Sequence, residues 1–182
     1  QLYIHVAGEP EELPGEGGEG DDETASELSY IVDKENGNLY RGTTANQAWN
    51  SVWKSTLTPQ LQFGCGVNNM NWSGNNVQMM TGTAGSSTYT LTAPAGYVIT
   101  DYSFTFANNN HSTALSLTMD NGTVYSTSST AQTVSASGQK LYSVSFVLAG
   151  ANGNGVLLSD FTVKVKEDKN EKPLVSTEGN EH

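Results

Sequence analysis

The chain has 182 residues, of which 36% are hydrophobic, and its formal net charge at pH 7 is −11. This length suits one ordinary domain with tails better than two domains. No apolar run reaches the roughly 18 residues that a membrane-spanning helix needs, so we expect no membrane span. Between Leu39 and Lys166 the sequence holds five basic and three acidic residues without a basic cluster, which argues against a nucleic-acid partner.

The acidic residues crowd into the two ends of the chain. Residues 7–28 combine Glu and Asp with Gly and Pro and cannot bury enough apolar surface to offset the entropy cost of ordering, so we interpret them as a linker. Residues 168–182 are interpreted as a second linker or tail. Residues 1–6 alternate like a remnant strand of a preceding domain, and residues 29–167 form the predicted module. No signal peptide opens the chain, so we expect a piece from inside a longer protein, tethered to other domains.

The first predicted elements of the module are a hairpin and a helix. The stretch SYIVDKENGNLYRG predicts a hairpin with its turn near Asn36 and Gly37. The stretch TANQAWNSVWKS, residues 44–55, predicts a short helix, because Trp49 and Trp53 lie four residues apart and would share one face. A lone helix must bury its apolar stripe, so these two indoles favour the core over a ligand site.

From residue 61 onward, short alternations of apolar and polar residues follow one another, each typical of a strand with one buried face. Asp120-Asn121-Gly122 between two of them is a strong hairpin signal. Cys65 predicts a buried, inert thiol, and a lone cysteine excludes an internal disulfide. The predicted inward residues are Leu61, Phe63, Cys65, Tyr89, Leu91, Tyr102, Phe104, Phe106, Leu115, Leu117, Met119, Val124, Tyr142, Val144, Phe146, Leu148, Phe161, Val163 and Val165.

The strand spacing predicts an all-β fold, an antiparallel, jelly-roll-like β-sandwich with one short helix near its N-terminal part. On the faces opposite the core, Ser and Thr predominate and aromatic residues are almost absent. Modules that bind long polysaccharides usually lay aromatic rings along such a face, so that sugar rings can stack on them. We therefore expect any ligand at the loops. The outward residues are Thr90, Thr92, Ser103, Thr105, Ser116, Thr118, Ser143, Ser145, Thr162 and Lys164.

Two asparagine-rich loops carry the candidate binding residues. The loop 66–76 offers amide donors and acceptors together, which sugar hydroxyls need, and an indole as an apolar wall. Counting alternate strand connections places it at the same end as 93–97, whereas 107–113 lies with 149–155 at the opposite end. Such loops also satisfy left-handed backbone angles and their own main chain, and that alternative stays open. The candidate ligand-binding residues are Asn69, Asn71, Trp72, Asn75, Asn76, Asn108, Asn109, Asn110 and His111.

Metal and catalytic chemistry find little support in the sequence. Asp160 with carbonyls of the loop 149–155 is a candidate for a structural calcium ion, although one carboxylate makes a poor calcium site. No other cofactor is predicted. Hydrolysis of a glycosidic bond needs two closely placed carboxylates, whereas Asp101, Asp120 and Asp160 fall on separate predicted elements. The sequence therefore predicts no catalytic residue.

The runs YRGTTANQAWNSVWKS, LQFGCGVNNMNW, GYVITDYSFTFANNN and AGANGNGVLLSDFTVKV follow in this order within residues 29–167. They resemble the accessory β-sandwich modules of secreted sialidases and other glycoside hydrolases of host-associated bacteria. The resemblance implies a non-catalytic carbohydrate-binding module, secreted or at the cell surface, that keeps a neighbouring enzyme on host glycans by binding their terminal sugars. It supplies no ligand residues that can be carried over.

Two alternatives stay open beside glycan binding. The polar outer faces and the flanking linkers fit a structural spacer equally well. An adhesive or inhibitory protein-binding module would need an exposed apolar patch. An exposed Trp72 beside convergent amides would favour glycan binding, whereas a buried Trp72 together with two loops bonded to themselves would favour the spacer.

Overall fold

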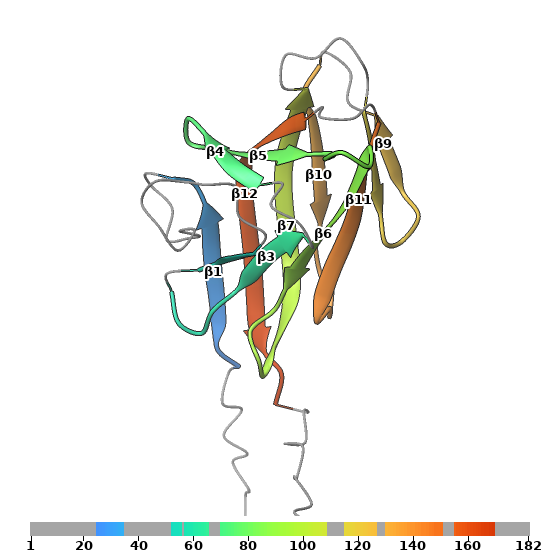
Figure 1. The fold of residues 1–182 in the computed structure, drawn as a ribbon. Helices are drawn as coiled ribbons and strands as arrows, with labels where there is room; N and C mark the ends of the chain where they lie inside the picture. Colours follow the sequence, from blue (N-terminus) through green and yellow to red (C-terminus); the bar gives the residue numbers. More distant parts are fainter. Residues whose placement is uncertain are drawn as a thin grey trace, which may run out of the picture.

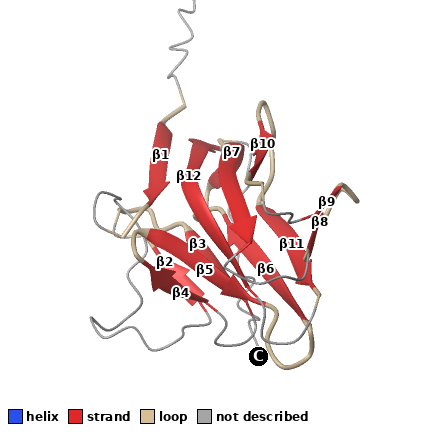
Figure 2. Cartoon of the chain, turned by 90° about the horizontal axis from the view of Figure 1, so that it is seen from above, coloured by secondary structure: helices blue, strands red, loops and turns tan. Residues whose placement is uncertain are grey.

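The computed structural model describes residues 25–34, 52–55, 57–65, 70–108, 115–126, 130–150 and 155–169, which fold into a β-sandwich (Figure 1). All regular elements of this part of the chain are strands (Figure 2). In chain order they are β1 (Glu27–Val32), β2 (Val52–Lys54), β3 (Gln62–Cys65), β4 (Met70–Ser73), β5 (Asn76–Met80), β6 (Ser86–Thr92), β7 (Tyr97–Asn108), β8 (Ser116–Met119), β9 (Val124–Ser126), β10 (Gln132–Ala136), β11 (Ser143–Ala149) and β12 (Gly155–Glu167).

The strands form two antiparallel, six-stranded sheets, which we call sheet A and sheet B. Sheet A has the order β10-β7-β12-β5-β4, with β1 also paired to β12. Sheet B has the order β2-β3-β6-β11-β8-β9. Strand β12 is long enough to have two partners on one side, since its beginning pairs with β5 and its later part with β1. The predicted all-β antiparallel sandwich is confirmed.

Aromatic rings from both sheets meet in the core. Phe63 and Phe146 of sheet B contact Phe161 and Phe104 of sheet A, and Tyr89 packs on both sheet B rings. The contacting ring centroids lie between 5.3 and 6.1 Å apart. All five rings are at most 2% exposed. Burying each such side chain stabilises the fold by about 1.5–3 kcal/mol, so this cluster is the main link between the two sheets.

The predicted helix over residues 44–55 is wrong where the structure describes it. Val52–Lys54 form β2, which pairs with β3 so that Trp53 lies opposite Phe63. Trp53 is buried as predicted, but on a strand. Its periodic spacing to Trp49, which lies outside the described residues, was a local signal, and pairing with β3 outweighs local propensity.

The predicted loop 66–76 is also wrong in its second half. Met70–Ser73 and Asn76–Met80 form the hairpin β4–β5, with Gly74 at a φ of 58° in its turn. Further along the chain, Tyr142 is 51% exposed and does not face the core, because β11 begins only at Ser143. Val124, predicted inward, is likewise 61% exposed.

Several local predictions are confirmed. Asp120-Asn121-Gly122 turn the chain between β8 and β9, where the Met119 N–H donates to the Thr123 carbonyl at 2.8 Å. Cys65 is buried and forms no disulfide. β1 begins at Glu27, two residues before the predicted start of the module. The predicted turn at Asn36 and Gly37 lies outside the described residues, as do residues 1–6 and most of both linkers. No helix in the described part is long and apolar enough to cross a bilayer.

The chain enters and leaves the sandwich side by side. Strand β1 runs antiparallel to β12, with Glu27 opposite Lys166, and the Glu167 N–H donates to the Ser26 carbonyl at 2.8 Å (Figure 1). Close by, the Asp168 N–H donates to the Gly96 carbonyl at 2.8 Å. The loop after β6 therefore lies at the same end as the exit of β12.

Candidate functional site

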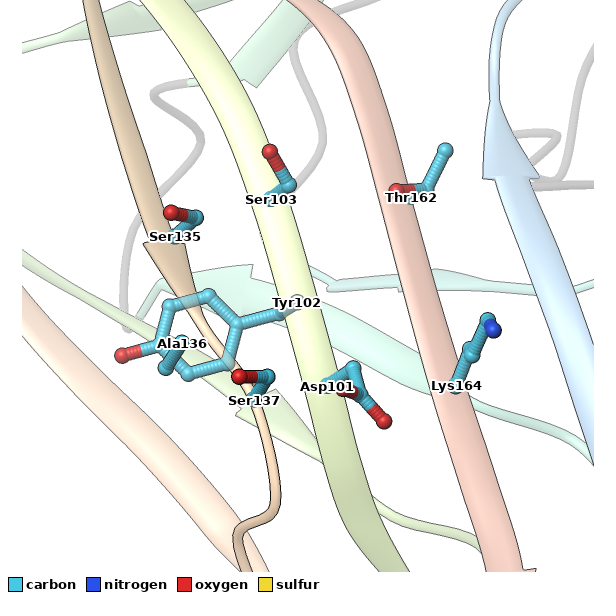
Figure 3. Close-up of a pocket in the computed structure, with 8 residues that line it drawn as sticks. All are labelled: Asp101, Tyr102, Ser103, Ser135, Ala136, Ser137, Thr162 and Lys164. Atoms are coloured by element: carbon cyan, nitrogen blue, oxygen red, sulfur yellow. The ribbon is translucent and has the colours of Figure 1, made fainter.

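An open depression lies on the outer face of sheet A, away from the core. It crosses β10, β7 and β12 and has a volume of about 370 Å³ (Figure 3). Its lining residues are Asp101, Tyr102, Ser103, Ser135, Ala136, Ser137, Thr162 and Lys164. The depression is thus built from the strands themselves and not from the loops where the sequence led us to expect a ligand.

Strand register sets these side chains in two rows across the sheet. In one row Ser135, Ser103 and Thr162 are neighbours on β10, β7 and β12. In the next row Asp101 of β7 lies opposite Lys164 of β12. Strands about 4.8 Å apart and outward residues about 6.8 Å apart along a strand give these rows a footprint of roughly 10 by 7 Å.

Irregularities in β12 frame the depression. The pairing of β12 with β7 shifts register between Ser159 and Thr162, and again between Lys164 and Val165. Asp160, inside the first shift, has a φ of 48°, a left-handed conformation that Asp tolerates better than most residues. Such bulges bend a strand and increase its twist. Because Thr162 and Lys164 lie between the two shifts, we attribute the hollow in this face to the two register shifts.

Most polar side chains of the depression form no bond with the part of the chain that the structure describes. Within the described part of the chain, the side chains of Asp101, Ser103, Ser135, Ser137 and Thr162 make no hydrogen bond or ion pair. Outside the depression but on the same face, the hydroxyls of Thr105 and Thr133 bond each other at 3.2 Å. The depression therefore presents donors and acceptors to solvent or to a ligand.

One charge of the depression has a partner and the other has none among the described residues. The Lys164 Nζ lies 4.0 Å from the Glu27 Oε1 on β1, and both side chains are about half exposed. Such a solvated pair contributes little to stability. Asp101 is the register partner of Lys164 but forms no ion pair with it. Its carboxylate is therefore an acceptor that faces the depression without a bound cation from the described chain.

Tyr102 lies on the central strand of the depression, but its side chain belongs to the buried core between the sheets. Ala136 of β10 is its register partner, and both residues are labelled in Figure 3. Burial raises the pKa of the Tyr102 phenol above its ordinary value, and the nearby Asp120 carboxylate and Tyr125 raise it further. The ring is only 8% exposed, so it supplies little surface on which a sugar ring can stack.

The described residues of the first asparagine-rich segment, from residue 70 onward, lie on the β4–β5 hairpin. The Asn71 Oδ1 accepts a hydrogen bond from the Trp72 N–H at 2.8 Å. The Asn75 carbonyl accepts from the Lys34 N–H at 3.3 Å, which puts this turn beside the end of β1 and not with the loop 93–97. Asn76 begins β5. The expected placement of 66–76 at the end of the sandwich is thus wrong for residues 70–76, because the hairpin adds an unexpected pair of strands.

Trp72 is part of the core and not an exposed wall. Its side chain is 9% exposed, and its ring centroid lies 4.5 Å from that of Trp53. The two indoles join the β4 edge of sheet A to the β2 edge of sheet B. The exposed indole that would have favoured a loop pocket is therefore absent at this position.

The second asparagine-rich segment is described only at its start. Asn108 ends β7 opposite Val156, near the start of β12. Asn69, Asn109, Asn110 and His111 lie outside the described residues, and their role as ligands stays a prediction.

No metal site or catalytic pair emerges from the described carboxylates. In this part of the chain no three His, Cys, Asp or Glu residues gather closely enough to hold a metal ion. Asp160 is exposed on its bulge, and the loop carbonyls predicted to join it at a calcium ion lie partly outside the description. The Asp120 Oδ2 accepts from the Ser145 N–H at 3.1 Å, on the opposite sheet from Asp101.

Sequence reasoning named most members of the depression without recognising a site. Ser103, Thr162 and Lys164 were correctly predicted to point outward, and Asp101 to lie within a strand. The missing information was that β10 and β12 flank β7, which no local pattern reveals. A carboxylate in the middle of a Ser/Thr-rich strand face was the one available signal.

Comparisons with known proteins give distant structural likenesses. No family model matches the sequence, and a search of curated proteins finds no match. Among solved structures, a family 29 carbohydrate-binding module is 11% identical with a TM-score of 0.42, covering 77% of this chain and 92% of its own. A variant of it in complex with mannohexaose gives the same values. The module TmCBM61, in complex with β-1,4-galactotriose, is 13% identical with a TM-score of 0.34, covering 58% and 88%.

Proposed function

We propose that this chain is a non-catalytic carbohydrate-binding module and that the depression on sheet A holds part of the sugar. The observation that carries the proposal is the set of polar groups on the outer face of β10, β7 and β12 that lack partners in the described chain.

The chemistry of the depression suits a sugar. Sugar hydroxyls both donate and accept hydrogen bonds, and so do the hydroxyls of Ser103, Ser135 and Thr162. The Asp101 carboxylate adds an acceptor and the Lys164 ammonium a donor, and hydrogen bonds to charged groups are stronger than neutral ones. A volume of about 370 Å³ lies within the usual range of about 300–1,000 Å³ for small-ligand sites. With little aromatic surface, the affinity of one module is expected to be weak and to depend on tethering.

The wider setting follows from the sequence resemblance. We propose that the module belongs to an exported, multidomain glycoside hydrolase of sialidase type, secreted or held at a bacterial cell surface. It would keep the attached enzyme on host glycans, with the asparagine-rich loop after Asn108 as a second contact region. The Ser-, Thr-, Asn- and Gly-rich composition supports export.

A structural spacer is the second candidate, and one observation favours it. Trp72 is buried against Trp53, so the hairpin offers no exposed indole to a sugar. On this alternative the polar depression is merely solvated.

A glycan array with the full chain decides between the two candidates. Ser103→Leu places an apolar side chain at the centre of the depression, and Thr88→Leu makes the same kind of change at an exposed position of sheet B. We expect wild type and Thr88→Leu to bind the same glycans and Ser103→Leu to bind none. Silence of correctly folded wild-type protein would reject glycan binding and favour the spacer. Binding that survives in Ser103→Leu would move the site away from sheet A.

A further inference from the structure

We infer that the depression selects an uncharged sugar, which it recognises by the bonds of neighbouring sugar hydroxyls to the Asp101 carboxylate, and that it discriminates against sugars that carry a carboxylate. This inference rests on the proposed function and names the ligand class of that same site.

Asp101 presents its carboxylate to the depression as a hydrogen-bond acceptor. An ionised carboxylate only accepts hydrogen bonds, and its two oxygens together can accept from two donors on adjacent carbons. Two other described carboxylates are already engaged: Asp120 by the Ser145 N–H at 3.1 Å, and Asp168 by the Tyr142 hydroxyl at 2.9 Å and Lys140 at 3.5 Å. Asp101 has no such bond within the described chain, yet it lines the depression.

The neighbouring cations do not cancel the charge of Asp101. Lys164 lies across from Asp101, but its Nζ is 4.0 Å from Glu27, and this pair is neutral as a unit. Lys166 lies opposite Glu27 in the strand register and does not line the depression. A sugar carboxylate placed here would therefore meet Asp101 without a surplus positive charge, and like charges at close range repel.

The hydroxyl row completes the selection. Ser103 and Ser135 lie in the row next to Asp101, and Ser137 follows the end of β10 on the same side. These groups serve a ligand that presents alternating donors and acceptors over a short distance. A neutral sugar ring does so on several adjacent carbons, whereas a simple anion or an apolar ligand does not.

The test compares neutral sugars with their uronic-acid counterparts, for example galactose with galacturonic acid and glucose with glucuronic acid. Binding to the full chain is measured by NMR titration at neutral pH. We expect wild type to bind at least one neutral sugar at least ten-fold more tightly than its uronic acid. Asp101→Asn should weaken binding of the neutral sugar at least ten-fold and remove most of the preference for it over the uronic acid, because the substitution replaces charge-assisted bonds by neutral ones.

Glu27→Gln is the matched variant on the other side of Lys164. It frees the ammonium from its partner, so binding of the uronic acid should improve while binding of the neutral sugar stays unchanged. Both variants should fold like wild type, since Asp101 makes no bond in the described chain and the Glu27 pair is solvated.

The outcomes separate this inference from the proposed function. If neutral sugars bind but Asp101→Asn binds them equally well, or if uronic acids bind as tightly to wild type, the inference is overturned and glycan binding stands. If no sugar or oligosaccharide binds to wild type in the titration or on the array, both fail.

Discussion

The outer faces of the two sheets have similar compositions but different structures. On sheet B, β11 pairs with β6 and β8 without a register shift, and the hydroxyls of Thr90 and Ser145 bond each other at 2.9 Å. On sheet A, β12 shifts register twice against β7, and the side chains of Asp101, Ser103 and Thr162 form no hydrogen bond or ion pair in the described chain. Ser and Thr content alone therefore does not define a binding face. Backbone irregularity decides whether a hollow forms and whether its polar groups stay available.

The largest expected effect is a loss of stability on substitution of Trp72, the residue that was predicted to form a ligand site away from sheet A. Trp72→Ala should lower the free energy of unfolding by about 3–5 kcal/mol, because it empties a buried position packed on Trp53. Urea denaturation monitored by circular dichroism measures this loss. Trp72→Phe, which keeps an aromatic ring, should cost less. A Trp72→Ala protein of wild-type stability that no longer binds glycans would instead place the ligand at the β4–β5 hairpin.

A smaller effect tests the contrast between the two faces directly. Thr90→Val removes the hydroxyl that bonds Ser145 at nearly constant shape, and should cost about 0.5–1.5 kcal/mol of stability. Ser103→Ala in the depression should change stability by less than about 0.5 kcal/mol, since no bond is lost within the described chain. Denaturation curves of both variants measure the difference. Equal costs would show that the two faces are not different in this respect.

The smallest expected effect is that of Tyr102 on stability, which appears only in alkaline solution. Burial raises the pKa of Tyr102 in the folded protein above its ordinary value of 10.0, so the neutral phenol is favoured by folding. The stability from this group is complete below pH 10, where the unfolded chain is also neutral, and is lost as the pH rises above 10. Tyr102→Phe should therefore flatten the fall in melting temperature between pH 9 and 11. Tyr30 and Tyr89, whose pKa values are also raised by burial, should leave part of the fall in place. An unchanged slope in Tyr102→Phe would contradict the assignment.

Strand faces were predictable from the sequence because alternation is a local property. Phe104 and Phe146 were placed inward and Ser103 and Ser145 outward from their own neighbours alone. The Asp120-Asn121-Gly122 turn was likewise predictable, since its backbone angles depend on the residues that form it.

Pairing partners were not predictable, and the errors follow from that. The spacing of Trp49 and Trp53 fits a helix, but β3 provides Val52–Lys54 with hydrogen bonds as a strand. The β4–β5 hairpin was taken for a loop because asparagines dominate it, although Met70 and Val77 bury its inner face. The depression depends on which strands flank β7 and on bulges in β12, both of which come from residues far apart in the sequence.

The adjacent entry and exit of the chain have a mechanical consequence. Strands β1 and β12 are antiparallel, and Ser26 is bonded to Glu167 at the end where both leave the sandwich. A pulling force applied to the two flanking segments would load this pair from one end, along hydrogen bonds that run perpendicular to the strands. The bonds would then break one after another, as in a zipper, instead of resisting together in shear. Tension would thus detach β1 first, together with Glu27, and leave Lys164 at the rim of the depression without its partner.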